Sequence, residues 1–229
     1  MKLIIGNKNY SSWSLRGWLA VKQSGLHFEE ITVPMFGEQW EETKQAVQGT
    51  QPSHGKVPIL WDGDTVVWDS LAILEYCADK VGRDRFWPKD DTARGMARSM
   101  VAEMHSSFAA LRRECPMNIR KTFEGATISE DARADTVRVL QLWAEARARF
   151  GQGGPFLFGK WSAADAFYTP VVTRFQTYGL ARTRDASDYC AHILEDALFR
   201  KLEEQAKAEP WWIEYGPDGR SSGYLQPPA

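Results

Sequence analysis

The hydrophobic pattern changes near residue 93, and this change limits the fold more than any other feature of the sequence. Before it, short apolar runs typical of strands alternate with amphipathic stretches typical of helices. After it, the strand patterns stop and apolar residues recur at helical spacing. Between the two parts, residues 82–92 mix Gly, Pro and charged residues, as a short linker does. We therefore expect an α/β half followed by an all-α half.

The first half predicts a mixed sheet with helices on its faces. Its elements follow the order β-α-β, a connection, then β-β-α. Asp62-Gly63 separates two apolar runs and suits a type I′ hairpin turn, and Gly25 stands where a helix would end. Strands are expected at 2–7, at 27–35 and on either side of Asp62-Gly63, and helices at 14–25 and 70–82.

The second half predicts a set of helices. Ser129 precedes acidic residues that suit the first turn of a helix. Pro170 should kink a helix or start one. The tail after Gly216 is rich in Gly, Ser and Pro and is expected to be an extended surface segment. Helices are expected at 93–115, 129–150, 164–179 and 197–212.

Composition favours an ordinary globular protein. Hydrophobic residues make up 43% and charged residues 25% of the 229 residues, so a packed core is expected. The net charge of −2 gives no electrostatic basis for binding nucleic acid or anionic membranes. The N-terminal apolar run is too short for a signal peptide or a membrane span. The three dispersed cysteines, Cys77, Cys115 and Cys190, suit a reducing compartment as small core residues, so a cytoplasmic protein is expected.

Two adjacent hydroxyls, Ser11 and Ser12, lie in "NYSSWSLRGW", where the first strand gives way to the first helix. Serine is among the best residues for capping a helix, because its oxygen accepts a hydrogen bond from a free N–H of the first turn. The alternative is that one hydroxyl faces a ligand. A single Ser-Ser pair is more often a cap.

Two further junctions could hold a ligand. In "GKVP", Val57 precedes a proline and can present its backbone N–H and C=O to an extended peptide, with a cis bond at Pro58 fixing the bend. In "WDS", Asp69 and Ser70 begin a helix, whose N-terminus favours a carboxylate while Asp69 can pair with an ammonium. A ligand that carries both charges, such as an α-amino acid, would suit this corner, although Asp69 or Ser70 could simply cap the helix.

Taken together, these motifs resemble those of the soluble glutathione S-transferases. "YSSWSLRGWLAV" resembles the serine-type N-terminal motif, particularly that of the zeta class and its bacterial relatives, "GKVPIL" resembles the cis-proline segment, and "WDSLAILEYCAD" the stretch with the acidic-Ser pair. "FLFGKWSAADAFYTPVV" resembles the buried helix start of the family, with Ser162 and Asp165 as an S-x-x-D capping box. The resemblance covers nearly the whole chain.

The resemblance implies a two-domain organisation. Residues 1–81 would form a thioredoxin-like glutathione-binding domain of order β-α-β-α-β-β-α. Residues 82–92 would be a linker, and residues 93–229 an all-α helical-bundle domain that holds the second substrate. It also implies a homodimer.

The resemblance also implies a glutathione site. Ser11 would hydrogen-bond the glutathione sulfur while Ser12 caps the helix, and Ser12 is the second candidate for the thiol contact. Val57, at the cis bond to Pro58, would hold the cysteinyl backbone. Asp69 and Ser70 would hold the γ-glutamyl end, and Lys56 the glycyl carboxylate. A hydroxyl donor at a helix N-terminus lowers the pKa of a thiol, and the thiolate is the reactive nucleophile.

The second substrate is expected against the first helices of the all-α half. Met104, His105, Phe108 and Arg112 lie roughly on one side by i, i+4 spacing, although Met104 and Phe108 could be ordinary core residues. No carboxylate, Cys or second His lies at metal-ligand spacing from His105, so no metal site is expected. Met-rich walls suit varied apolar electrophiles.

The predicted function is conjugation of glutathione to small hydrophobic electrophiles, in the manner of a detoxification enzyme. The zeta pattern has Cys where this chain has Trp13, which weakens the case for isomerase activity of the zeta type. The alternatives are a glutathione-dependent cis–trans isomerase acting on a small unsaturated diacid, a peroxidase, and a non-catalytic binding or regulatory protein on the same fold.

Overall fold

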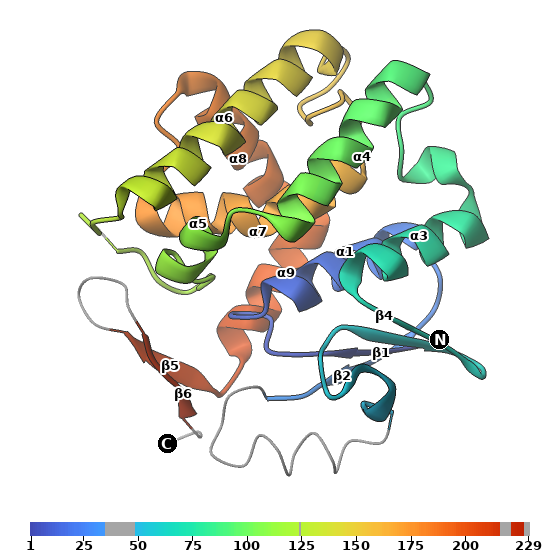
Figure 1. Ribbon diagram of the computed structural model, residues 1–229. Helices are drawn as coiled ribbons and strands as arrows, with labels where there is room; N and C mark the ends of the chain where they lie inside the picture. The colour runs from blue at the N-terminus through green and yellow to red at the C-terminus, as the bar shows by residue number, and fades with distance from the viewer. Residues whose placement is uncertain (35–48, 124, 216–220, 227–229) are drawn as a thin grey trace.

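A mixed four-stranded sheet forms the base of the N-terminal half (Figure 1). The computed structural model describes residues 1–34, 49–123, 125–215 and 221–226. The strands are β1 (Lys2–Ile5), β2 (Glu29–Thr32), β3 (Ile59–Asp62) and β4 (Thr65–Trp68), in the spatial order β2-β1-β3-β4. β1 runs parallel to β2, whereas β3 is antiparallel to both β1 and β4. The helix that the family resemblance implies between β2 and β3 falls on residues 35–48, outside the described residues.

Two helices cover the sheet on the side that faces the helical half (Figure 1). α1 (Ser12–Ser24) and α3 (Ser70–Val81) pack against each other. The predicted end of the first helix is confirmed, because Gly25 adopts φ 72° and its N–H bonds the carbonyl of Lys22. The predicted mixed sheet with helices on its face is therefore confirmed for the described residues.

The β3–β4 hairpin is confirmed, but its turn differs from the predicted one. The two residues between the strands are Gly63 and Asp64 rather than Asp62 and Gly63. Of these, Gly63 has a positive φ of 60° and Asp64 does not. A type I′ turn needs positive φ at both central residues, so that prediction is wrong.

The strand register brings three chain junctions to one end of the sheet. Ile59 at the start of β3 pairs with Ile4 of β1 and with Trp68 at the end of β4. The segment after β1, the segment before β3 and the segment after β4 therefore leave the sheet side by side. The first of these segments contains the Ser11–Ser12 pair, the second contains Val57 and Pro58, and the third contains Asp69 and leads into Ser70.

The C-terminal half is built mainly of helices around α7 (Figure 1). Every residue of α7 (Ala163–Tyr178) except Gln176 is buried. The helix continues through Pro170. The alternative that a helix begins at Pro170 is therefore wrong. The other helices are α4 (Asp91–Ser106), α5 (Ala109–Glu114), α6 (Glu130–Phe150), α8 (Arg184–Glu195) and α9 (Ala197–Ala208), with short 3-10 turns η1 (Gln51–Ser53) and η2 (Arg83–Arg85) in the first half and after α3.

The predicted capping box at the start of α7 is confirmed and is more extensive than its motif. Both the N–H and the hydroxyl of Ser162 donate to Asp165 Oδ2, at 2.8 and 2.9 Å. The N–H of Leu157 and the hydroxyl of Tyr189 donate to Oδ1, both at 3.1 Å. Burial raises the pKa of Asp165 to about 6. One buried carboxylate therefore joins α7, α8 and the loop before α7.

Three helix predictions need correction. The helix expected over 93–115 is two helices, α4 and α5, because Phe108 adopts φ 60° and the helix cannot pass through it. α8 was not anticipated, and α9 ends at Ala208 rather than near 212. The predicted helix start at Ser129 is confirmed, with its oxygen accepting the N–H of Ala132.

A β-hairpin follows α9, so strands are not confined to the first half. β5 (Trp212–Tyr215) pairs antiparallel with β6 (Ser221–Gln226). The sequence predicted no strand here and treated the segment after Gly216 as an extended tail. The ring of Tyr215 stacks on that of Tyr10 with centroids 6.4 Å apart, which places the hairpin beside the loop that precedes α1.

The core is continuous across both halves. It includes Phe86 and Trp87 in the segment expected to be a linker, and these two side chains are 0% and 3% exposed. The cysteines Cys77, Cys115 and Cys190 are free and buried, as predicted, and burial raises their pKa values to about 11, 11 and 12. Over the described ranges, no helix combines the length and apolarity that crossing a membrane requires. The boundaries at 81 and 93 stay a prediction.

Candidate active site

Ser11 caps the first helix. Its oxygen accepts the N–H of Ser14 at 3.3 Å, and its hydroxyl donates to Ser14 Oγ at 2.9 Å. Ser14 Oγ in turn accepts the N–H of Gly6 at 2.8 Å. Both the oxygen and the proton of the Ser11 hydroxyl are thus used inside the turn. The expectation that Ser12 would be the cap is wrong.

Ser12 faces the helical half of the chain. Its oxygen accepts a hydrogen bond from Arg174 Nη2 on α7 at 3.3 Å. No acceptor for the proton of the Ser12 hydroxyl is found in the part of the chain that the structure describes. The Ser12 oxygen already accepts a hydrogen bond from a cation, while its hydroxyl proton has no acceptor among the described residues. Ser12 is therefore arranged to donate a hydrogen bond.

Arg174 is held rigidly behind Ser12. Its Nε donates to the carbonyl of Cys115 at 2.8 Å and its Nη1 to that of Pro170 at 3.0 Å. The side chain is buried, and burial followed by repulsion from Arg112 lowers its pKa to about 10. Arg174 therefore remains a cation at neutral pH, fixed within hydrogen-bonding distance of a serine 162 positions earlier in the chain.

Arg16 is a second buried cation and lies one helical turn after Ser12 in α1. Its Nε donates to Ser70 Oγ at 3.0 Å, and its Nη1 lies 3.7 Å from Met104 Sδ. Its Nη2 is buried and has no hydrogen-bond partner among the described residues. Burial, then repulsion from Arg112 and Arg174, lowers its pKa to about 9. Such a donor satisfies its hydrogen-bonding capacity only with a further acceptor.

Trp13 packs against two arginines. The Cζ of Arg16 lies 4.1 Å and that of Arg112 lies 4.8 Å from the centroid of its ring. The imidazole of His105 meets the same ring edge-on at 5.2 Å. Trp13 thus connects α1 with α4 and α5 at the boundary between the two halves.

The corner after β4 joins the two halves through Asp69. Asp69 caps α3 with φ 76°, and its Oδ1 accepts the N–H of Leu71 at 2.8 Å. Its Oδ2 lies 3.4 Å from His105 Nε2. Burial lowers the pKa of His105, opposed by Asp69, so the imidazole is mostly neutral at pH 7. Ser70 is fully buried, and its hydroxyl oxygen bonds Arg16 rather than facing solvent.

The segment before β3 has the predicted cis bond between Val57 and Pro58. A Cβ on Gly17 would lie 2.7 Å from Pro58 Cγ, so only glycine lets α1 lie this close to the proline. Pro58 is buried, Val57 is half-buried and Lys56 is exposed. Lys56 has its carbonyl fixed by Ser53 Oγ at 2.6 Å. The strand register places this segment between Asp69 and the loop that leads from β1 to the serine pair (residues 6–10, the serine loop).

The four residues predicted to contact the second substrate separate into two pairs. Met104 and Phe108 are 0% and 4% exposed and belong to the core. His105 and Arg112 are partly buried and gather at Trp13, and Arg112 Nη1 donates to the carbonyl of His105 at 3.3 Å. Within the described chain, no group of three or more His, Cys, Asp or Glu side chains could hold a metal ion.

A cavity of about 780 Å³ lies elsewhere, between α7, α8 and α9. Thr173, Cys190 and Phe199 are among its lining residues, and none of the predicted site residues is. The predicted substrate contacts and this cavity are therefore separate features.

Sequence reasoning missed Arg174 and the contacts made by the C-terminal segment. A signal for Arg174 did exist, since it is the only charged residue in the otherwise apolar and hydroxyl-rich run "AFYTPVVTRFQTYG". A lone charge on the buried face of a helix needs a partner and often has a function. No local pattern marks Glu209, whose partners lie about two hundred residues earlier.

Two family models match the chain in the order of its two halves. The model of the glutathione S-transferase N-terminal domain matches residues 10–80, and that of the C-terminal domain matches residues 126–191. Glutathione S-transferase F10 of Arabidopsis thaliana is 35% identical over 68 residues, which cover 29% of this chain and 30% of the plant protein. Glutathione S-transferase theta-1 of Bos taurus is 30% identical over 149 residues, 62% of this chain and 60% of the bovine protein. The chain thus spans less than two thirds of the length of either curated relative.

Solved structures share the fold over nearly their whole length. A glutathione transferase homologue from Burkholderia, with bound glutathione, has a TM-score of 0.67 at 20% identity and covers 91% of this chain and 98% of its own. A maleyl pyruvate isomerase, described as a bacterial glutathione S-transferase of the zeta class, has a TM-score of 0.63 at 18% identity and covers 91% and 99%. With the two domain models matched in sequence order and the fold shared, this chain belongs to the glutathione S-transferase superfamily.

Proposed function

We propose that the chain is a glutathione transferase in which Ser12 stabilises the glutathione thiolate. The observation that carries the proposal is the Ser12 hydroxyl at the N-terminus of α1, with its oxygen bound to Arg174 and its proton free to donate. A hydroxyl donor, a helix N-terminus and a nearby cation all favour a thiolate over a thiol. The family resemblance favours Ser11, whereas the hydrogen bonds favour Ser12.

The three junctions at the sheet end support a binding mode for glutathione. The backbone N–H and C=O of Val57 would pair with the cysteinyl residue, in the way that an added strand pairs with a sheet edge. The Asp69 carboxylate would pair with the γ-glutamyl ammonium, and the N-terminus of α3 with its carboxylate. Lys56 is exposed and could reach the glycyl carboxylate. Ser70 would act through Arg16, because its hydroxyl oxygen accepts the Arg16 N–H.

The reaction follows from that placement. The thiol proton leaves to solvent, and the sulfur lone pair forms the new C–S bond with an electrophilic carbon. In a displacement, the leaving group departs with its bonding electron pair, and in an addition the substrate takes up a proton. The protein lowers the barrier by holding a larger thiolate fraction at neutral pH than the few per cent of a free thiol.

Titration of bound glutathione tests this proposal. The ultraviolet absorbance of the thiolate, measured against pH with S-methylglutathione as the non-ionising reference, should give a pKa about one unit or more below that of the free thiol. The same protein should turn over a chromogenic aryl halide. Bound glutathione that titrates like the free thiol, or absence of binding, would contradict the proposal.

A second candidate function is glutathione-dependent isomerisation of a small unsaturated diacid. The observation that favours it is a group of three arginines, Arg16, Arg112 and Arg174, whose positive charges repel one another. Asp69 is the carboxylate that attracts Arg16. Such a surplus of positive charge favours an anionic second substrate over the purely apolar electrophile that the sequence suggested. Peroxidase and non-catalytic functions have no such observation behind them.

Arg112 gives the discriminating variant. A charge-assisted hydrogen bond contributes about 1.5–3 kcal/mol, so Arg112→Met should lower kcat/KM for an unsaturated diacid by about tenfold or more. The neutral diester should be affected less. Arg113→Met is the matched control, since Arg113 is exposed and its side chain pairs with Glu114. Equal effects of Arg112→Met on diacid and diester would contradict the anionic assignment.

Homodimer assembly, a cytoplasmic location and a role in detoxification stay predictions.

A further inference from the structure

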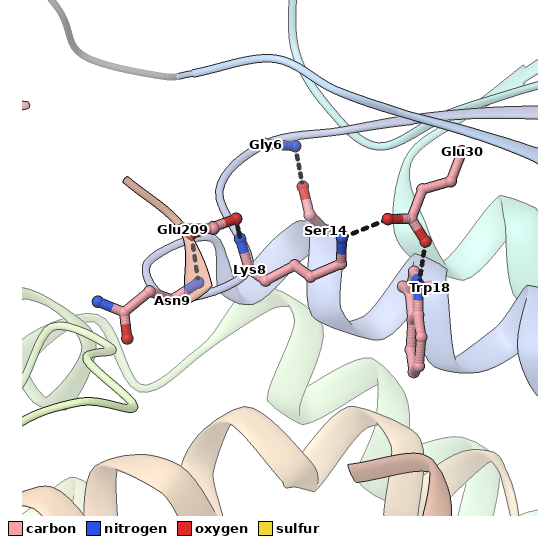
Figure 2. Close-up of polar contacts among 7 residues, drawn as sticks. All are labelled: Gly6, Lys8, Asn9, Ser14, Trp18, Glu30 and Glu209. Atoms are coloured by element: carbon pink, nitrogen blue, oxygen red, sulfur yellow. Dashed lines mark hydrogen bonds and ion pairs between the residues drawn. The ribbon is translucent and has the colours of Figure 1, made fainter. Parts of the chain in front are cut away.

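The loop that leads into the serine pair is held by the far end of the chain. The Glu209 carboxylate accepts two successive backbone N–H groups of this loop, that of Lys8 on Oε1 at 2.7 Å and that of Asn9 on Oε2 at 3.3 Å (Figure 2). Glu209 follows α9 and lies 201 residues after Lys8. A carboxylate that spans two adjacent N–H groups fixes the orientation of the peptide between them.

The side chains of Asn9 and Tyr10 also bind residues of the C-terminal half. Asn9 is fully buried, with its Nδ2 donating to Asn118 Oδ1 at 3.2 Å and its Oδ1 accepting the N–H of Arg120 at 3.0 Å. The hydroxyl of Tyr10 accepts the N–H of Ile213 in β5 at 2.9 Å. Three consecutive residues before Ser11 are therefore bound to the C-terminal half of the chain.

Arg120 keeps Glu209 in place. Its guanidinium donates to the carbonyls of Ala206, Trp211 and Glu209, the last at 2.5 Å. Arg120 thus binds the segment that carries Glu209 through its side chain and the loop through its backbone N–H. The segment and the loop cannot shift independently.

The loop transmits its position to the serines through a tight turn. The N–H groups of Tyr10 and Ser11 both donate to the carbonyl of Asn7, at 3.3 and 2.8 Å. A rotation of the peptide at Lys8–Asn9 therefore moves the start of α1. We propose that Glu209 is a positioning residue that fixes the serine loop, and thereby the thiolate donor; the catalytic part of this inference rests on the proposed transferase function.

The side chain of Lys8 has partners of its own. Its ammonium pairs with Glu30 Oε1, and Glu30 Oε2 accepts Trp18 Nε1 at 2.6 Å (Figure 2). Glu209 therefore acts on the backbone of Lys8 and is not needed to pair its charge. Burial raises the pKa of Glu209, and the hydrogen bonds from the N–H groups of Lys8 and Asn9 are the first of the effects that oppose this shift. Replacing the carboxylate should disturb the loop more than the overall fold.

The test compares Glu209→Ala and Glu209→Gln with Glu204→Ala, a change at an exposed residue of α9. Amide hydrogen exchange is measured without glutathione. We expect exchange at Lys8 and Asn9 to accelerate about tenfold or more in Glu209→Ala, because a lost hydrogen bond lowers the free energy of local opening. Glu209→Gln should lie between, since its single carbonyl oxygen can accept one of the two N–H groups. Glu204→Ala should match wild type.

The same variants are then assayed with glutathione. We expect Glu209→Ala to lower kcat about tenfold and to raise the pKa of the bound thiol, with the glutathione KM changed less than threefold. Exchange at Lys8 and Asn9 equal to that in Glu204→Ala would overturn the proposal. Faster exchange with unchanged kcat and thiol pKa would overturn its catalytic part. A wild-type protein that binds no glutathione would instead contradict the transferase function, and the exchange data would still decide whether Glu209 fixes the loop.

Discussion

Asp165→Ala should lower the free energy of unfolding by about 3–5 kcal/mol, because four buried donors lose their acceptor at once. The donors are the N–H and hydroxyl of Ser162, the N–H of Leu157 and the hydroxyl of Tyr189. Leu157 and Ser162 lie in the loop before α7 and Tyr189 lies on α8, so the change also removes the hydrogen bond that joins α8 to the start of α7. Denaturant unfolding with a fitted midpoint and slope measures the change.

Asp165→Asn separates the hydrogen bonds from the charge. The amide accepts with one terminal atom and presents N–H groups to the other pair of donors, so its effect should lie between wild type and Asp165→Ala. The pKa of Asp165 is raised to about 6 in the folded state from 3.8, so the unfolded state loses this proton at lower pH. Stability from this group therefore falls as the pH rises from about 4 to 6, by about 3 kcal/mol. The stability difference between wild type and Asp165→Asn should follow that slope, and a difference independent of pH would contradict the assignment.

Ser12→Ala should lower kcat/KM for glutathione conjugation by about 100-fold, since removing one preorganised donor to a developing or resident anion has an effect of this size. The pKa of the bound thiol should rise towards its free value. Arg174 would also lose its Nη2 acceptor, which adds a local structural effect. Single-turnover kinetics with a chromogenic aryl halide and the thiolate titration measure both quantities.

Ser11→Ala is the matched control for Ser12→Ala. It removes the N-cap of α1, which should lower stability by about 1 kcal/mol, while the Ser12 hydroxyl remains. We expect a smaller loss of activity, within about tenfold, because the thiolate donor itself is retained. The reverse order, with Ser11→Ala inactive and Ser12→Ala active, would return the thiol contact to Ser11.

Features governed by neighbouring residues were predicted well from the sequence. The strand at 2–7, the helix ended by Gly25 and the capping box at Ser162 all follow from interactions within a few residues. The cis peptide before Pro58 was expected from a local motif and its family resemblance. Such signals survive in one sequence because the physical cause lies beside the residue concerned.

Features governed by distant residues were not predicted. The hydrogen bond that distinguishes Ser12 from Ser11 comes from Arg174, which only the packing of α7 against α1 brings near. No glycine or proline marks the helix break at Phe108 in the sequence. The φ of 60° at this phenylalanine is imposed by its surroundings in the fold. The turn at Gly63 was misplaced by one residue, since hairpin register depends on which strand residues pair.

The hydrogen bonds between Glu209 and the N–H groups of Lys8 and Asn9 have a consequence for the order in which the chain folds during synthesis. The loop is synthesised before the helical half, and its partners Arg120, Glu209 and Ile213 follow it by more than one hundred residues. A nascent chain that has reached residue 81 already contains both serines, Val57 and Asp69, yet it lacks the three partners that bind the loop from the helical half. The loop would then reach its final position only after Ile213 has been synthesised and the helical half has folded onto the sheet.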